Sequence, residues 1–281
     1  MSLTTGIFPT NAKVAYVTPL LKKPGLDKTI YANFRPISNL SFISKVLERV
    51  VLEQLQCHLD SEPALNTLQS EYRRHHSTET ALNKITSNIL SKMNCQRVTV
   101  LVLLDFSAAF DTIEHQTLID RLMLNYNISS VPLNWFRSYL CNRQQAVCVG
   151  QSTATPVTVS RGIPQGSVLG PVLYTLYTAL LHHIISSHHL SAHYYTDDTQ
   201  IYFSCKLTEL HTAIARLEVC ISDMIRWLVS NNLALNAAKS ELLLFGTKQQ
   251  QAKVTQPIVV RIGDSAVISS QIARNFGVWL Y

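Results

Sequence analysis

The chain has 281 residues, of which 47% are hydrophobic, so it can form one large core or two lobes and is not a disordered polypeptide. Lysine and arginine outnumber aspartate and glutamate by 24 to 18, and the resulting net charge of +6 permits a polyanionic partner such as nucleic acid. The six cysteines form no Cys-x-x-Cys pair and the amino terminus lacks the blocks of a signal peptide, which argues against a zinc site and against secretion.

The first periodic pattern along the chain is SFISKVLERVVLEQLQCHL, residues 41–59. Its apolar residues recur close to the helical period, and Ser41 stands where an N-cap is expected. We therefore predict a helix with one buried apolar stripe and a charged opposite face. The members of the stripe are Ile43, Val46, Leu47, Val50, Leu55 and Leu59.

A second amphipathic helix and a buried strand are predicted next. In RRHHSTETALNKITSNILSKM, Ser77 or Thr78 can cap the helix and Glu79 suits the positive end of its dipole. Its apolar side comprises Ala81, Ile85, Ile89 and Met93. Residues 98–106, VTVLVLLDF, are a continuous apolar run rich in β-branched residues, which indicates a strand covered on both faces and ended by Asp105.

The segment RGIPQGSVLGPVLY, residues 161–174, predicts a tight glycine-containing loop around Gln165 and then a helix with Pro171 in its first turn. Glycine in such a loop permits close backbone approach to a ligand. The apolar stretch 167–185 approaches the length of a membrane span, but Gly170-Pro171 and the paired histidines at 182 and 183 favour a buried helix.

Two adjacent aspartates, Asp197 and Asp198, lie between strand-like flanks in AHYYTDDTQIYF. A solvated turn explains them without any function. Alternatively, Asp105 lies beside Asp197 at one sheet edge, where their mutual repulsion calls for a cation such as Mg²⁺, which takes carboxylate oxygens and keeps sites open for phosphates.

The last third of the chain predicts a long helix over residues 208–230 that stops at Asn231-Asn232, then a hairpin around Gly263-Asp264 and a final short strand in NFGVWLY. The apolar stripe of the helix comprises Leu210, Ile214, Leu217, Ile221, Ile225 and Leu228. Strands and helices that mix in this way indicate an α+β sheet domain.

Five motifs in order, LLDFSAAFDTIEH, GIPQGSVLGP, YTDDTQIY, LNAAKSELLLFG and NFGVWL, resemble the successive palm motifs of reverse transcriptases. The likeness is to LINE-type, non-LTR retrotransposons. Upstream, PLLKKPGLDKTIYANFRPISNLSFISKVLERVV resembles the fingers segment of these enzymes, and QSEYRRHHSTETAL resembles their connector. The resemblance covers residues 8–281.

The resemblance implies roles at the catalytic end of the palm. Asp105, Asp197 and Asp198 would hold two Mg²⁺ ions, with Mn²⁺ as an alternative, and Lys239 would protonate the leaving pyrophosphate. Phe110 would be the steric gate that excludes a ribose 2′ hydroxyl. Core packing for Phe110 and a plain surface position for Lys239 remain the alternatives.

The resemblance also implies contacts with nucleotide and template. Arg35 would clamp the incoming triphosphate with help from Lys22 or Lys23, and Gln165 and Gly166 would line the nucleotide and template pocket. The basic cluster of Arg73, Arg74, His75 and His76 would track template phosphates, and a solvated run of charge is its alternative. Thr196 departs from the family, which usually has alanine there.

By the same resemblance we expect a right-hand polymerase architecture with an antiparallel palm sheet packed on helices. Fingers would occupy residues 1–97, interleaved with a palm at 98–281, and the thumb would be largely absent. The implied activity is RNA-directed DNA synthesis from RNA template, DNA primer and deoxynucleoside triphosphates, inside the cell and by family analogy in the nucleus, with no membrane. A catalytically idle nucleic-acid-binding remnant and another Mg²⁺-dependent phosphotransferase stay open, as does the oligomeric state.

Overall fold

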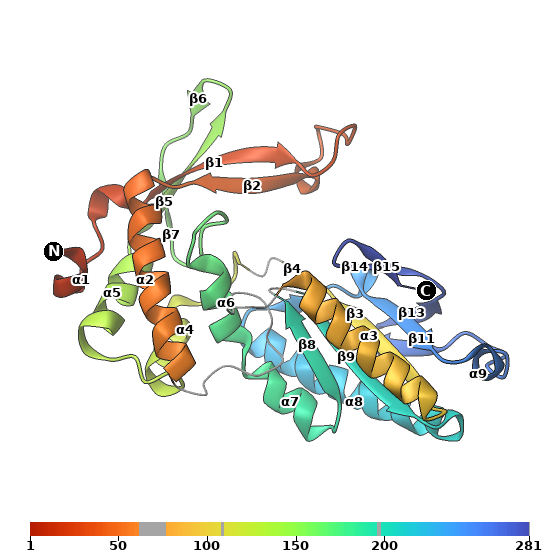
Figure 1. Ribbon diagram of the computed structural model, residues 1–281. Coiled ribbons are helices and arrows are strands. Elements are labelled where there is room, and N and C mark those ends of the chain that lie inside the picture. Colours follow the sequence, from red (N-terminus) through yellow and green to blue (C-terminus); the bar gives the residue numbers. More distant parts are fainter. Residues whose placement is uncertain (62–76, 108–109, 196–197, 281) are drawn as a thin grey trace. The chain divides into compact units, whose positions relative to one another are not determined.

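A computed structural model describes residues 1–61, 77–107, 110–195 and 198–280, with only the backbone of Tyr195 and Asp198. The chain divides into two compact units, and each is made of two separate segments (Figure 1). Unit 1 contains Met1–Leu65 and Phe110–Tyr177, whereas unit 2 contains Asn66–Ala109 and Thr178–Tyr281. The names fingers, for residues 1–97, and palm, for 98–281, stay a prediction.

In the sheet of unit 1, β1 (Val14–Leu21) lies between β2 (Phe34–Asn39) and β5 (Arg143–Val149). It pairs antiparallel with β2 and parallel with β5. Two short strands, β6 (Ser152–Thr153) and β7 (Val157–Val159), both pair antiparallel with β5. A parallel pair needs a long crossover. Here more than a hundred residues separate β1 from β5, so the order of these strands is set by tertiary structure and not by neighbouring hairpins.

Helices complete unit 1. Their bounds are α1 Ser2–Thr5, α2 Phe42–Ser61, α4 His115–Leu124, α5 Ser130–Leu140 and α6 Gly170–Thr178, with short 3₁₀ turns η1 Thr10–Ala12 and η2 Tyr31–Asn33. An aromatic group anchors the core, because the ring of Phe8 meets the edges of Trp135 and Tyr139 at centroid distances of 5.5 and 5.2 Å. Edge-to-face pairs of this kind add to the free energy gained from burying apolar area.

The start of α2 confirms the predicted N-cap, since Ser41 Oγ accepts the backbone N–H of Ser44 at 3.2 Å. The predicted buried stripe is partly wrong. Ile43, Val46 and Val50 are exposed at 57%, 45% and 39%, and the supposedly charged face contains Glu48, which is fully buried. The buried side of the helix comprises Ser44, Glu48, Val51, Leu55 and Leu59.

Unit 2 is built on a six-stranded sheet in the order β12-β13-β11-β3-β9-β8. Its strands are β3 Val98–Leu104, β8 Ser191–Tyr195, β9 Asp198–Cys205, β11 Glu241–Phe245, β12 Val259–Ile262 and β13 Ser265–Ser270. All neighbours are antiparallel except β11 and β13. The central strand β3 is buried along almost its whole length, which confirms the predicted strand covered on both faces.

Helices cover this sheet: in Figure 1, α3 (Thr78–Asn94) lies in front of β3 and β9, and α8 (Leu210–Ser230) lies behind them. The predicted capping of α3 is confirmed by a reciprocal capping box between Ser77 and Thr80. The predicted end of α8 is also confirmed, because Asn231 caps it and Asn232 adopts a left-handed conformation with φ 56°.

The remaining elements of unit 2 are short. They are α7 Leu181–Ser187, α9 Lys248–Gln251, the 3₁₀ turns η3 Leu207–Glu209 and η4 Ala237–Lys239, and the two-stranded sheets β4 (Phe106–Ser107) with β10 (Ala234–Leu235) and β14 (Ala273–Asn275) with β15 (Val278–Leu280). The hairpin around Gly263-Asp264 is confirmed by β12 and β13. The predicted last strand in NFGVWLY exists, but it pairs with β14 and not with the large sheet.

The stretch 167–185 forms two helices, α6 and α7, in place of the single buried helix that was predicted. Tyr174 and Leu176 in α6 and Ile185 in α7 are fully buried. Across the described ranges of the chain, no helix is long and apolar enough to span a membrane.

Candidate active site

Asp105 stands directly after the central strand β3 of unit 2, where a rigid backbone fixes its direction. Its backbone carbonyl accepts the N–H of Asn236 at 2.8 Å, and the next residue, Phe106, pairs with Leu235. Its carboxylate is partly buried, with a side-chain exposure of 29%. A carboxylate held in this way at the end of a strand is accessible to solvent and still has a defined position.

Lys239 is brought to Asp105 by this backbone connection. It ends the 3₁₀ turn η4, and its Nζ lies 3.2 Å from Asp105 Oδ2. The lysine side chain is 65% exposed, so the ion pair itself adds little to stability. The two groups are 134 residues apart in the chain, and their contact places the motif LNAAKSELLLFG beside the end of LLDF.

The paired aspartates are described only in part. Asp197 lies outside the described residues, and Asp198 begins β9 with its backbone alone described. β3 and β9 pair antiparallel up to Leu104 opposite Thr199, and Asp105 and Asp198 are the next residues beyond this last pair. Adjacent strands lie about 5 Å apart. The ladder therefore brings the chain at Asp105 and at Asp198 to the same end of the sheet.

The end of the sheet at Asp105 offers the kind of ligand atom that a hard divalent ion binds. Carboxylate oxygen is the ligand that Mg²⁺ prefers, and Asp105 presents one at the end of the sheet where β9 begins with Asp198. Among the residues that the structure describes, no three or more His, Cys, Asp or Glu side chains are grouped so that they could hold a metal ion. Around Asp105, a cavity of about 110 Å³ is also lined by Lys239, Glu241 and Arg274.

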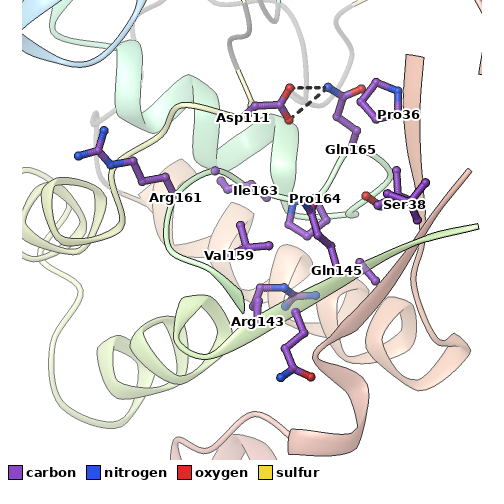
Figure 2. Close-up of a pocket in the computed structure, with 15 residues that line it drawn as sticks. Pro36, Ser38, Asp111, Arg143, Gln145, Val159, Arg161, Ile163, Pro164 and Gln165 are labelled. Carbon is purple, nitrogen blue, oxygen red and sulfur yellow. Dashed lines mark hydrogen bonds between the residues drawn. The ribbon is translucent and has the colours of Figure 1, made fainter. Parts of the chain in front are cut away.

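Gln165 lies in unit 1, in the loop that precedes α6. Its carbonyl accepts the backbone N–H of Ser38 at 2.8 Å, which ties the loop to β2. Figure 2 shows its side-chain amide directed at Asp111, with Nε2 3.1 Å from Oδ2 and 3.3 Å from Oδ1. Both residues line a cavity of about 330 Å³ that also includes Ser38 and Arg161. A cavity of this size is large enough for a small ligand group.

The two glycines of the loop are required by close approach within the protein. Gly162 has φ +82°, and a Cβ there would lie 2.6 Å from the backbone oxygen of Asp111. Gly166 has φ +114°, and a Cβ there would lie 2.7 Å from the backbone oxygen of Ser38. The expected close approach of backbone therefore occurs, but it is to other parts of the chain.

Phe110 begins the second segment of unit 1. Its ring packs against Tyr174 at a centroid distance of 5.2 Å, and its carbonyl accepts the N–H of Ile163 at 2.8 Å. The side chain is partly exposed. The ring therefore packs on Tyr174 of α6 and still presents part of its surface to solvent.

The predicted triphosphate-binding residues lie where β1 ends and β2 begins in the sheet of unit 1. Arg35 is exposed in β2, opposite Leu20 in β1. Lys22 follows β1 and donates from Nζ to the carbonyl of Ala32 at 2.7 Å, and Lys23 is exposed in the adjoining turn. The cluster of Arg73, Arg74, His75 and His76 lies outside the described residues.

Two acidic residues that no motif argument assigned are central to unit 1. Asp111 stands inside LLDFSAAFDTIEH and holds the Gln165 amide; loss of hydration raises the pKa of its carboxyl, while the hydrogen bond from Gln165 opposes that rise. Glu48 is fully buried in α2 and contacts the loop at Ser167. A glutamate in an amphipathic helix is expected to face solvent, so the hydrophobic periodicity gave no indication that Glu48 is buried.

The family model described as reverse transcriptase (RNA-dependent DNA polymerase) matches residues 21–261. Among curated proteins, a probable RNA-directed DNA polymerase from transposon BS of Drosophila melanogaster is 29% identical, and the match covers 89% of this chain and 28% of that protein. A probable RNA-directed DNA polymerase from transposon X-element of the same species is 27% identical over 97% of this chain and 29% of that protein. The chain thus spans less than a third of these relatives.

Two solved structures resemble the fold. Apo telomerase from Candida tropicalis, truncated from the C-terminal domain, matches with a TM-score of 0.61 at 12% identity over 94% of this chain and 56% of that one. Telomerase from Candida albicans with a TWJ fragment of telomeric RNA matches with a TM-score of 0.59 at 13% identity over 94% of this chain and 47% of that one.

Proposed function

The chain belongs to the reverse transcriptase (RNA-dependent DNA polymerase) family, and on that premise we propose that it copies an RNA template into DNA as part of a non-LTR retrotransposon protein. The observation that carries this proposal is the Asp105 carboxylate, fixed at the end of the central strand with Lys239 Nζ at 3.2 Å. The relatives named as RNA-directed DNA polymerases are more than three times as long as the matched segment, so template, primer and nucleotide are part of the proposal.

In the proposed reaction the 3′ oxygen of a DNA primer attacks the α-phosphorus of a deoxynucleoside triphosphate. A new phosphorus–oxygen bond forms, the bond to the β-phosphate oxygen breaks, and pyrophosphate leaves. The primer hydroxyl loses its proton to solvent, and the leaving pyrophosphate gains one from the ammonium of Lys239. The place of Lys239 beside Asp105 supports this role, because both groups would then face the same phosphates.

Asp105, Asp197 and Asp198 are the residues that would hold two Mg²⁺ ions, or Mn²⁺ in their place. When bound, such ions would activate the attacking hydroxyl and stabilise charge on the leaving group. Asp105 is suited to this because β3 and the Asn236 backbone contact fix it before any ligand arrives. A preformed carboxylate loses little freedom when it binds an ion.

The remaining roles concern binding and choice of nucleotide. We assign the triphosphate clamp to Arg35 with Lys22 or Lys23, the sugar gate to Phe110, the lining of the nucleotide and template pocket to Gln165 and Gly166, and template phosphates to Arg73, Arg74, His75 and His76. Arg35 is exposed and free of a carboxylate partner among the described ion pairs, which leaves its fork-shaped donor set available for phosphate oxygens.

Primer extension on an RNA template with Mg²⁺ tests the proposal. We expect the wild-type chain to add deoxynucleotides, and Asp105→Asn or Asp197→Asn to reduce the rate by about a hundredfold or more, because each removes a charge that the metal ions require. Removal of divalent ions with EDTA should stop the reaction, and Mg²⁺ or Mn²⁺ should restore it. The rate is measured from the length distribution of a labelled primer.

Asp264→Asn is the matched control, since Asp264 lies in the exposed turn between β12 and β13 of the same unit. It should extend the primer like wild type. Salt-sensitive RNA binding with no incorporation by the wild type would contradict the proposal in favour of an idle nucleic-acid-binding remnant. Untemplated hydrolysis of a phosphate ester would favour another phosphotransferase.

A further inference from the structure

A buried carboxylate in α2 holds the loop that carries Gln165. We propose that Glu48 is a positioning residue for nucleotide addition: it fixes the start of α6 so that Gln165 is presented in one conformation. The inference rests on the proposed polymerase function, in which Gln165 lines the nucleotide and template pocket. Glu48 itself would touch neither substrate nor primer.

Four hydrogen-bond donors converge on the two oxygens of Glu48. Oε1 accepts from Ser44 Oγ at 2.7 Å, one turn earlier in α2. Oε2 accepts from Ser167 Oγ at 2.7 Å and from the backbone N–H groups of Val168 at 2.7 Å and Leu169 at 3.2 Å. One oxygen therefore faces its own helix, and the other collects every contact with the loop, which is about 120 residues away in the chain.

The identity of the donors follows from the chemistry of the carboxylate. Ser167 Oγ donates its single hydroxyl hydrogen to Glu48 Oε2. Ser167 Oγ must then accept from Tyr139, whose hydroxyl lies 2.7 Å away, and from the backbone N–H of Gly170 at 2.9 Å. Burial raises the pKa of Tyr139, which keeps that hydroxyl protonated and able to donate. The whole chain of bonds therefore has one direction.

The contacts define the geometry of the loop from both sides. On one side, Ser38 in β2 donates its N–H to the Gln165 carbonyl at 2.8 Å, and Gly166 packs against the Ser38 backbone. On the other side, Glu48 holds the three residues 167–169 that directly precede α6. Gln165 lies between these two anchors, so its backbone has little freedom, and its side chain is left to reach Asp111 and the cavity.

Core stability alone does not account for a carboxylate at this position. A buried ionised group costs free energy, and an apolar residue of similar size would fill the space without that cost. None of the described ion pairs includes Glu48. The segment that leads into α6 instead supplies the backbone N–H groups of Val168 and Leu169, which a carboxylate satisfies well. The residue is therefore suited to holding this particular loop.

The decisive experiment is a double-mutant cycle between Glu48→Gln and Gln165→Ala in primer extension, at a temperature where all variants are folded. Glutamine has nearly the same shape, but its NH₂ group meets groups that are themselves donors. We expect Glu48→Gln to raise KM for the nucleotide about tenfold with a smaller change in kcat. In the Gln165→Ala background the same substitution should change KM little, because the positioned group is gone.

Ser44→Ala is the matched control, since Ser44 is equally buried and donates to the other oxygen of Glu48. It should lower stability without a change in KM. Equal effects of Glu48→Gln with and without Gln165 would overturn the positioning role while the polymerase proposal stands.

Hydrogen exchange of the backbone amides of residues 162–170 tests the positioning role of Glu48 independently of the proposed polymerase activity. Glu48→Gln should accelerate exchange of the Val168 and Leu169 amides, and Ser44→Ala should not. A wild type that adds no nucleotide overturns the proposed function, and exchange then decides whether Glu48 holds the loop. Unchanged exchange in Glu48→Gln would overturn that role as well.

Discussion

The orientation and protonation of single side chains in this protein depend on partners that are distant in sequence. Asp111 is the clearest example. Its carboxylate accepts the Gln165 amide from 54 residues away. In this contact Gln165 donates from Nε2 to both Asp111 oxygens, which leaves the amide oxygen for other partners. The motif letters reveal Asp111 but give no sign that it controls the orientation of Gln165.

The raised pKa of Asp111 predicts a pH dependence of stability. The folded chain favours the protonated acid, so the stability due to this group is fully present below its unfolded pKa and is lost as pH rises through its folded pKa. We expect the unfolding free energy of wild type minus that of Asp111→Asn, measured in urea, to decrease from acid toward neutral pH.

Gln165→Ala provides the control for this titration. The Gln165 hydrogen bond lowers the Asp111 pKa, so its removal should move the decrease to higher pH. A difference between wild type and Asp111→Asn that grows as pH rises would show that the carboxylate is stabilised in its charged form, contrary to this account.

Among the elements, α8 and α2 contrast in how well periodicity predicted their buried faces. In α8 four of the six predicted members of the stripe are buried, and the other two, Ile214 and Ile225, are partly buried. The buried members are Leu210, Leu217, Ile221 and Leu228. In α2 the predicted stripe failed at Ile43, Val46 and Val50, because the loop before α6 supplies the donors that allow Glu48 to be buried. Hydrophobic periodicity identifies a helix reliably but orients it only when no buried polar partner competes.

The buried stripe of α8 predicts large effects of truncation. Leu217 is fully buried, so Leu217→Ala should lower the unfolding free energy by about 2–5 kcal/mol through lost burial and a residual cavity. Val229→Ala, in the same helix, should change it by less than about 0.5 kcal/mol, because Val229 is 66% exposed. Urea unfolding followed by circular dichroism measures both, and equal effects would contradict the assigned face.

At the scale of the whole chain, family and fold agree with the sequence. The predicted membership of the reverse transcriptases is confirmed by the family match over residues 21–261. The predicted α+β right-hand polymerase fold is confirmed by the mixed sheets and helices and by the likeness to telomerase structures. Each compact unit combines two separate segments, so neither unit corresponds to one continuous stretch of sequence.

The six cysteines give a readout of folding for the whole chain. All are free thiols; Cys57, Cys95 and Cys141 are exposed, whereas Cys205 and Cys220 are buried. Burial raises the pKa of Cys220 to about 12, and the thiolate is the reactive form. We expect iodoacetamide to alkylate the three exposed thiols first and the two buried ones only after denaturation, as followed by peptide mass spectrometry. Early labelling of Cys220 would contradict the burial of the inner face of α8.

The sequence by itself determined the existence of α2, α3, α8, β3 and the β12–β13 hairpin, the order of the motifs and the family, because apolar period, caps and turn residues are local signals. It also brought Asp105, Lys239 and Gln165 to attention through those motifs. No pattern predicted β1, β2, β5, α4 or α5 of unit 1. Only the tertiary structure decided that Lys239 contacts Asp105, that Asp111 holds Gln165 and that Glu48 is buried. Each of these contacts joins segments 54 to 134 residues apart, and no local pattern encodes which distant donors will meet an acceptor.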